Sequence, residues 1–108
     1  SHDVRAISAI TECEDRGIRV PQDVSIVGFD DLPMTAHTLP SLTTIRQDRA
    51  AIGKCGFYAL SSLLNEVAIG SILLRATLIV RDSTGPAPSG MPGLSGSGSV
   101  SPGCFPIA

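Results

Sequence analysis

Two adjacent carboxylates, Asp30 and Asp31, have the residue type and position that best fit a binding role in this sequence. They follow residues 24–29, a short β-branched run that predicts a buried strand. In an open parallel sheet, ligands bind beyond the carboxyl ends of the strands. A carboxylate there can accept strong charge-assisted hydrogen bonds from the hydroxyl groups of a sugar. Asp30 is therefore a candidate ligand contact, and Asp31 is expected to cap the short helical turn that follows it. The alternative for both is that they only satisfy loop amides.

Other chemistries find no support in the sequence. It has no GxGxxG, no phosphate-binding GxxxxGK[ST] and no GxSxG motif. Its three cysteines, Cys13, Cys55 and Cys104, have no CxxC spacing and are expected to be reduced thiols, which weakly favours the cytoplasm. No third carboxylate lies at loop-ligand spacing from Asp30 and Asp31, so no metal site is expected. We therefore expect neither an enzyme nor a bound cofactor.

The elements that would position the two carboxylates follow from hydrophobic spacing. Residues 2–16 form a predicted amphipathic helix, capped by Asp3 and ended by Gly17. Asp48 opens a long helix to about residue 66, and residues 72–80 predict a strand. The long helix carries two apolar stripes and so needs neighbours on two sides. These stripes are Ile52, Cys55, Ala59 and Leu63, and Phe57, Leu60 and Leu64.

Composition divides the chain of 108 residues at about residue 84. Residues 85–108 contain six Gly, five Pro and five Ser but no charged residue, and are predicted to be disordered. The net charge of −2 argues against a stand-alone nucleic-acid binder. No apolar run approaches the roughly 18 residues of a membrane span, so no membrane partner is expected. The missing initial Met and the small number of elements predict a fragment of a larger α/β protein.

The segments VPQDVSIVGFDD, residues 20–31, and LPSLTTIRQD, residues 39–48, resemble the effector-binding core of LacI/GalR (lactose/galactose repressor) transcription regulators. The resemblance runs in order through residues 1–84 and ends with LIVRDST, residues 78–84. It implies part of a periplasmic-binding-protein-like (type I) three-layer α/β/α core with a parallel sheet. Residues 1–84 would then hold pieces of both subdomains, which three crossovers join in this family.

The resemblance also implies roles for individual residues. Asp30 matches the family's effector-binding Asp, and His2 stands where the family has a ligand-binding Asn. An imidazole cannot donate and accept toward two adjacent hydroxyls as an amide can, so this departure bears on sugar preference. The alternative for His2 is an exposed terminal residue. Six residues match the family's dimer interface, with ordinary packing as the alternative: Ile7, Thr11, Met34, His37, Thr38 and Leu39.

The function implied is the sugar or small-molecule effector-binding and dimerisation segment of a bacterial LacI-type repressor in the cytoplasm. The intact protein would be a homodimer and would contact DNA only through a helix-turn-helix that this chain lacks. Two alternatives stay open. One is the solute-binding component of a sugar transporter, which shares the core architecture. The other is a non-functional truncated remnant.

Overall fold

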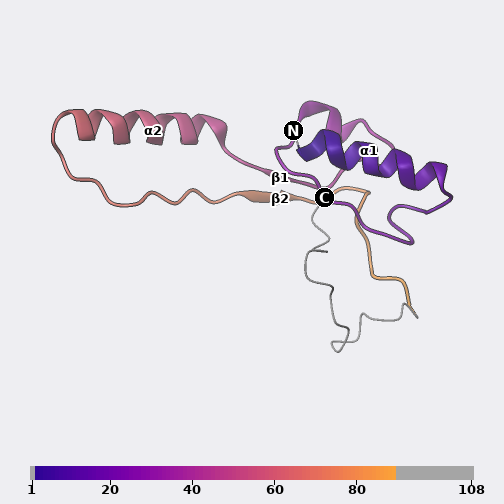
Figure 1. Ribbon diagram of the computed structural model, residues 1–108. Coiled ribbons are helices and arrows are strands. Elements are labelled where there is room, and N and C mark those ends of the chain that lie inside the picture. The colour runs from indigo at the N-terminus through magenta and orange to yellow at the C-terminus, as the bar shows by residue number, and fades with distance from the viewer. Residues whose placement is uncertain (1, 90–108) are drawn as a thin grey trace.

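The computed structural model describes residues 2–89. Figure 1 shows two parts, one gathered around the first helix and one in which the second helix projects away. Between them the chain crosses in two neighbouring strands. In chain order the elements are α1 (His2–Asp15), the 3-10 helix η1 (Pro33–Ala36), β1 (Thr44–Arg46), α2 (Arg49–Leu64) and β2 (Thr77–Ile79).

Helix α1 confirms the predicted amphipathic helix and its stop. Gly17 has a φ of 73°, which glycine adopts without the Cβ penalty of other residues. The Ile18 amide donates to the carbonyl of Cys13 at 2.8 Å and closes the last turn. One face of α1 supplies Ala6 and Ile10 to a small core that Ile26 and Leu42 complete.

The predicted strand over residues 24–29 is extended but irregular. It forms one parallel bridge, between Val27 and Thr43, and the Gly28 amide donates to the Thr43 carbonyl at 2.9 Å. The predicted parallel pairing is therefore confirmed. The prediction of a regular strand buried on both faces is wrong, because Val24 is exposed and only Ile26 and Gly28 are buried.

The hydrogen-bonded sheet within residues 2–89 has two antiparallel strands, with Thr44 opposite Ile79 and Arg46 opposite Thr77. The strand predicted over residues 72–80 is shortened to β2. No three-layer parallel sheet forms from these residues alone. A parallel sheet buried on both faces needs strands and helices beyond those that residues 2–89 form.

Helix α2 begins as predicted. The side chain of Asp48 accepts a hydrogen bond from the Ala51 amide at 2.9 Å and caps the helix. Its predicted packing on two sides is absent among the described residues, where Ser62 is its single buried side chain. Phe57 and Leu64 are 74 % and 75 % exposed. Within residues 2–89, neither α1 nor α2 has the length and apolar character of a membrane-spanning helix.

The predicted disordered segment 85–108 lies mostly outside the described residues, which end at residue 89. At its start, the Gly85 amide donates to the Ser25 hydroxyl at 3.0 Å. This bond fixes the first residue beyond the predicted boundary against the extended segment.

Candidate functional site

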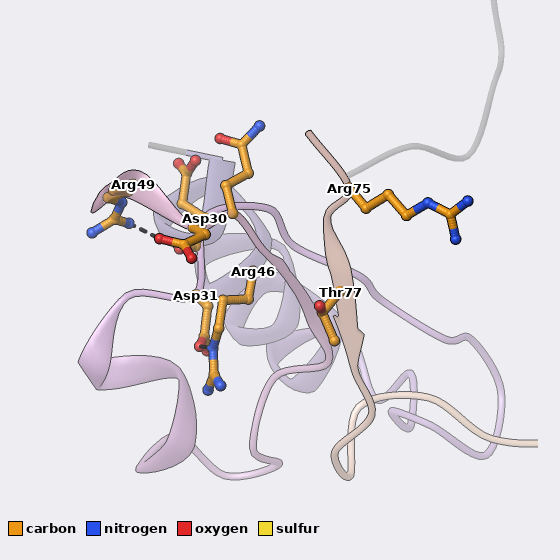
Figure 2. A pocket seen from close by; sticks show the side chains of 8 residues that line it. Asp30, Asp31, Arg46, Arg49, Arg75 and Thr77 are labelled. Atoms are coloured by element: carbon orange, nitrogen blue, oxygen red, sulfur yellow. Dashed lines mark hydrogen bonds and ion pairs between the residues drawn. The ribbon is translucent and has the colours of Figure 1, made fainter. Parts of the chain in front are cut away.

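A cleft of about 450 Å³ lies where the extended segment 24–29 ends. Its walls come from the turn after that segment, from the end of β1 with the start of α2, and from the approach to β2 (Figure 2). Three Asp and three Arg residues are among those that line it, so residues of both charge signs border the cleft. The lining residues are Asp30, Asp31, Arg46, Gln47, Asp48, Arg49, Arg75 and Thr77.

The turn that carries Asp30 is strained. Asp30 has a φ of 116° and Asp31 a φ of 54°, both in the region that favours glycine. Each such residue costs on the order of 1–3 kcal/mol and persists only where its surroundings hold it. The Asp30 amide donates to the Ile45 carbonyl at 2.9 Å, and Arg49 Nη2 donates to the Asp30 carbonyl at 2.8 Å. The predicted ligand contact thus lies in the cleft wall, in a conformation fixed by its neighbours.

Asp31 is the centre of an ion-pair cluster. Its Oδ2 accepts from Arg46 Nε at 2.6 Å, and its Oδ1 accepts from Arg81 Nη2 at 2.9 Å. Burial alone would raise the pKa of this carboxyl, but the hydrogen bonds from Arg46 and Arg81 outweigh it and lower the pKa. The predicted capping role is wrong. Leu32 precedes η1 without a side-chain cap, and Asp31 is occupied by the two arginines.

Asp3 has a larger role than the sequence suggested. It is fully buried, and its two oxygens accept from the Leu32 amide at 2.8 Å and from the Thr44 hydroxyl at 2.6 Å. The predicted role as a helix cap is wrong, because both oxygens serve other segments. A Cβ at Gly28 would collide with the Asp3 carboxylate, so this position requires glycine. Asp3 therefore links α1 to the Asp30 turn and to β1.

His2 lies next to the turn but does not line the cleft. Its ring meets the ring of Phe29 edge to face, with centroids 6.1 Å apart. The structure thus brings His2 to the residue before Asp30, and its proposed ligand contact stays a prediction.

The six predicted dimer-interface residues differ in exposure. Ile7 packs against the core, and the Thr38 hydroxyl donates within its own loop, to the Pro40 carbonyl at 2.9 Å. The Thr11 hydroxyl donates to the Ile7 carbonyl at 3.2 Å. Four side chains are exposed on the surface: Thr11, Met34, His37 and Leu39.

Sequence reasoning missed most of the residues on the opposite wall of the cleft. Gln47 and Arg49 flank the cap of α2, and Arg75 and Thr77 approach from the returning strand. A second hollow of about 230 Å³ adjoins the cleft through Gln47, Asp48 and Arg75. It adds apolar walls from Ile52, Ile72 and Leu74. No local motif marks these positions. The second wall forms only where the chain returns after α2, so its residues are distant in sequence from Asp30.

The residues that line the cleft can donate hydrogen bonds to a polyhydroxylated molecule and accept hydrogen bonds from it. The adjoining hollow adds an apolar surface. Among the residues that the structure describes, no group of three or more His, Cys, Asp or Glu side chains could hold a metal ion. The lining residues offer hydrogen-bond donors and acceptors at the surface of the cleft.

Comparisons with known proteins point the same way. A family model for the periplasmic binding protein-like domain matches residues 1–84. The transcriptional repressor CytR of Escherichia coli strain K12 is 39 % identical over 84 residues, which cover 76 % of this chain and 25 % of CytR. The chain thus spans about a quarter of the length of this curated relative.

Solved structures agree at the level of the fold. The Lac repressor dimer bound to operator and the anti-inducer ONPF is 35 % identical, with a TM-score of 0.68 over 73 % of this chain and 28 % of that chain. A periplasmic binding protein/LacI transcriptional regulator from Alkaliphilus metalliredigens, complexed with D-xylulofuranose, is 29 % identical, with a TM-score of 0.66 over 79 % of this chain and 33 % of that chain. CytR and the Lac repressor are transcription repressors, which favours a regulator over a transporter component.

Proposed function

The chain belongs to the periplasmic binding protein-like domain family, among its LacI/GalR transcription regulators, and we propose that it is the effector-binding and dimerisation segment of a repressor. The observation that carries this proposal is the polar cleft beside the strained Asp30 turn. A cleft at the carboxyl end of the extended segment is where an open α/β sheet binds ligand. The remaining walls of the site, and the three-layer core itself, would come from the rest of the protein.

The effector we propose is a sugar or a sugar-like metabolite. Asp30 accepts hydrogen bonds from its hydroxyl groups, and Gln47 can both donate and accept from the facing wall. His2 would contribute from the start of α1, through its contact with Phe29. The adjoining apolar hollow, with Ile52 and Leu74, would take a less polar part of the ligand.

Effector binding would act on DNA at a distance. Binding between two subdomains favours one of their relative arrangements, and this differential affinity is the coupling free energy between the two sites. The exposed Met34, His37 and Leu39 lie on a surface suited to a homodimer contact. DNA would be read through a helix-turn-helix outside this chain, in the cytoplasm.

Calorimetry with the full gene product tests the site. The probes are D-xylulose and ONPF, the ligands of the two structural relatives. We expect one of them, or a related sugar from a panel, to bind, and the Asp30→Ala variant to lose at least tenfold in affinity while keeping operator binding. Unchanged sugar affinity in Asp30→Ala would show that the site is elsewhere. No binding of any sugar in the panel by the unaltered protein would refute the sugar-effector proposal.

A further inference from the structure

We propose that Asp31 is a positioning residue that, through Arg81, clamps the Asp30 turn to the segment leaving β2. The inference rests on the proposed function of Asp30 as the effector contact. Asp31 itself is nearly covered, with 9 % of its side chain exposed, and faces two arginines from different segments. Its part is to set where Asp30 lies.

We call the Asp31–Arg81 ion pair the clamp, and Arg81 is its second partner. Its Nη2 donates to Asp31 Oδ1 at 2.9 Å, and its Nη1 donates to the Thr35 hydroxyl and the Leu42 carbonyl, both at 2.9 Å. Because a guanidinium is planar and rigid, these bonds fix the relative positions of the turn, η1 and the chain before β1. Only 17 % of the Arg81 side chain is exposed, so water screens the pair weakly.

Arg46 forms the more exposed half of the cluster. It binds the second oxygen of Asp31 at 2.6 Å from the end of β1, but 56 % of its side chain is exposed. An exposed pair gains less from its charge than a covered one, because water competes for both partners. Arg81 is therefore expected to contribute more than Arg46 to the position of the turn.

A second anchor, the Asp3 carboxylate with its hydrogen bonds, also restrains the turn. Asp3 accepts from the Leu32 amide, and the Thr44 hydroxyl, itself bonded to Asp3, accepts from the Asp31 amide at 3.3 Å. This anchor fixes the main chain on both sides of the Asp31 side chain. The strained φ angles of Asp30 and Asp31 are thus maintained by bonds from α1, β1 and the segment after β2.

The clamp makes the position of Asp30 depend on β1 and β2. Arg46 lies on β1, and Arg81 follows β2, its antiparallel neighbour. A shift of either strand would pull on Asp31 and so turn Asp30 in the cleft. By reciprocity, a ligand that fixes Asp30 would favour the strand positions that keep the clamp closed.

The test measures amide hydrogen exchange by NMR in the full gene product without ligand. Asp31→Asn is the decisive variant, because asparagine tolerates the left-handed backbone of this position while it removes the charge. We expect the Asp30 and Leu32 amides to exchange about tenfold faster or more, and the α1 amides to be accelerated much less. The matched control is Asp23→Asn, which removes the exposed ion pair with Arg19 and should leave the turn unaffected.

Two further variants separate positioning from general stability. Arg81→Gln should reproduce the effect of Asp31→Asn, the double variant should add little to either, and Arg46→Gln should have the smaller effect. Equal acceleration in α1, or additive effects of Asp31→Asn and Arg81→Gln, would overturn the clamp. This outcome is independent of the sugar titrations, so the clamp and the proposed function can fail separately. With a bound sugar from the panel, Asp31→Asn should weaken affinity less than Asp30→Ala does.

Discussion

The body around α1 and the arm formed by α2 differ in what holds each in place. We define the body as residues 2–46 and 77–85, and the arm as residues 47–76. The body has four buried hydrophobic side chains, Ala6, Ile10, Ile26 and Leu42, and five buried polar ones. These polar groups are Asp3, Thr35, Thr43, Thr44 and Ser83. Among the described residues of the arm, Ser62 is the one that is buried, and large apolar side chains face outward.

The difference shows how a small core can be supplemented. Ser83 is fully buried, donates to the Ile26 carbonyl at 2.6 Å and accepts from the Thr43 amide at 2.8 Å. Buried bonds of this kind connect segments distant in sequence, and an unsatisfied partner would cost about 1–3 kcal/mol. The arm has a good local helix but no such cross-links. Its apolar stripes therefore indicate a surface that the rest of the protein would cover.

The largest difference in stability between the two regions is expected when a buried side chain is shortened in one and an exposed side chain in the other. Leu42 is fully buried at the centre of the body, whereas Leu64 is exposed at the end of α2. We expect Leu42→Ala to destabilise the body by about 3 kcal/mol, and Leu64→Ala to change it by less than about 0.5 kcal/mol. Amide exchange in α1 of the 108-residue chain measures both. A similar cost for the two variants would mean that the arm is part of one cooperative unit with the body.

Two glycines offer a second contrast. A Cβ at Gly28 would collide with the Asp3 carboxylate and lie 2.8 Å from Leu42 Cδ2, whereas a Cβ at Gly53 in α2 meets nothing within 4 Å. We expect Gly28→Ala to cost about 2 kcal/mol through overpacking. Gly53→Ala should stabilise the helix by about 1 kcal/mol, because alanine has the higher helix propensity. Circular dichroism during urea unfolding would report both, and a neutral Gly28→Ala would show that Asp3 has room to move.

These contrasts also show what the sequence could predict. The Gly17 stop and the Asp48 cap depend on neighbours within one helical turn, so residue types alone indicated them. The part-buried hydrogen bonds of Asp3 and Asp31 join residues 29 and 50 positions apart, to Leu32 and Arg81. Such pairs leave no periodic or local signal, so the sequence pattern predicts only caps for both acids.

The candidate site follows the same division. Asp30 was identified because it directly follows a strand-like run, and it lies in the cleft. Gln47, Arg49 and Arg75 were missed because their wall forms only when the chain returns from the arm. The order of helices and extended segments was thus predictable. Which residues form the second wall of the cleft, after the chain returns from α2, was not predictable.

Acid should weaken the body before it affects the arm. The pKa of Asp31 is lowered from its ordinary value of 3.8, because the hydrogen bonds from the two arginines outweigh the opposing effect of burial. A carboxylate with a lowered folded-state pKa contributes stability above its unfolded pKa and loses it as the pH falls through the folded value. The stability of α1 should therefore be level from pH 7 to about 5 and fall below about pH 4.

Salt distinguishes Asp31 from the exposed acid Asp23, whose pKa is lowered to about 2, first by the hydrogen bond from the Arg19 side chain. About 1 M salt should screen the exposed pair and leave most of the Asp31 contribution. Asp31→Asn should flatten the acid transition at both salt concentrations, and Asp23→Asn should do so only at low salt. An acid transition unchanged in Asp31→Asn would show that the ion-pair cluster does not stabilise the body.

A substitution in the arm is expected to change stability least, while it clearly reduces association between copies of the chain. Phe57 is 74 % exposed on α2, so Phe57→Ser removes apolar surface without opening a cavity. In the 108-residue chain we expect α1 exchange to change by less than about 0.5 kcal/mol. Size-exclusion chromatography should show less self-association, because exposed apolar surface drives contact between copies. The same substitution in the full gene product should instead destabilise the protein, since there the stripe would be covered. If Phe57→Ser leaves both the association of the chain and the stability of the full gene product unchanged, the outward face of α2 is a solvated surface and needs no partner.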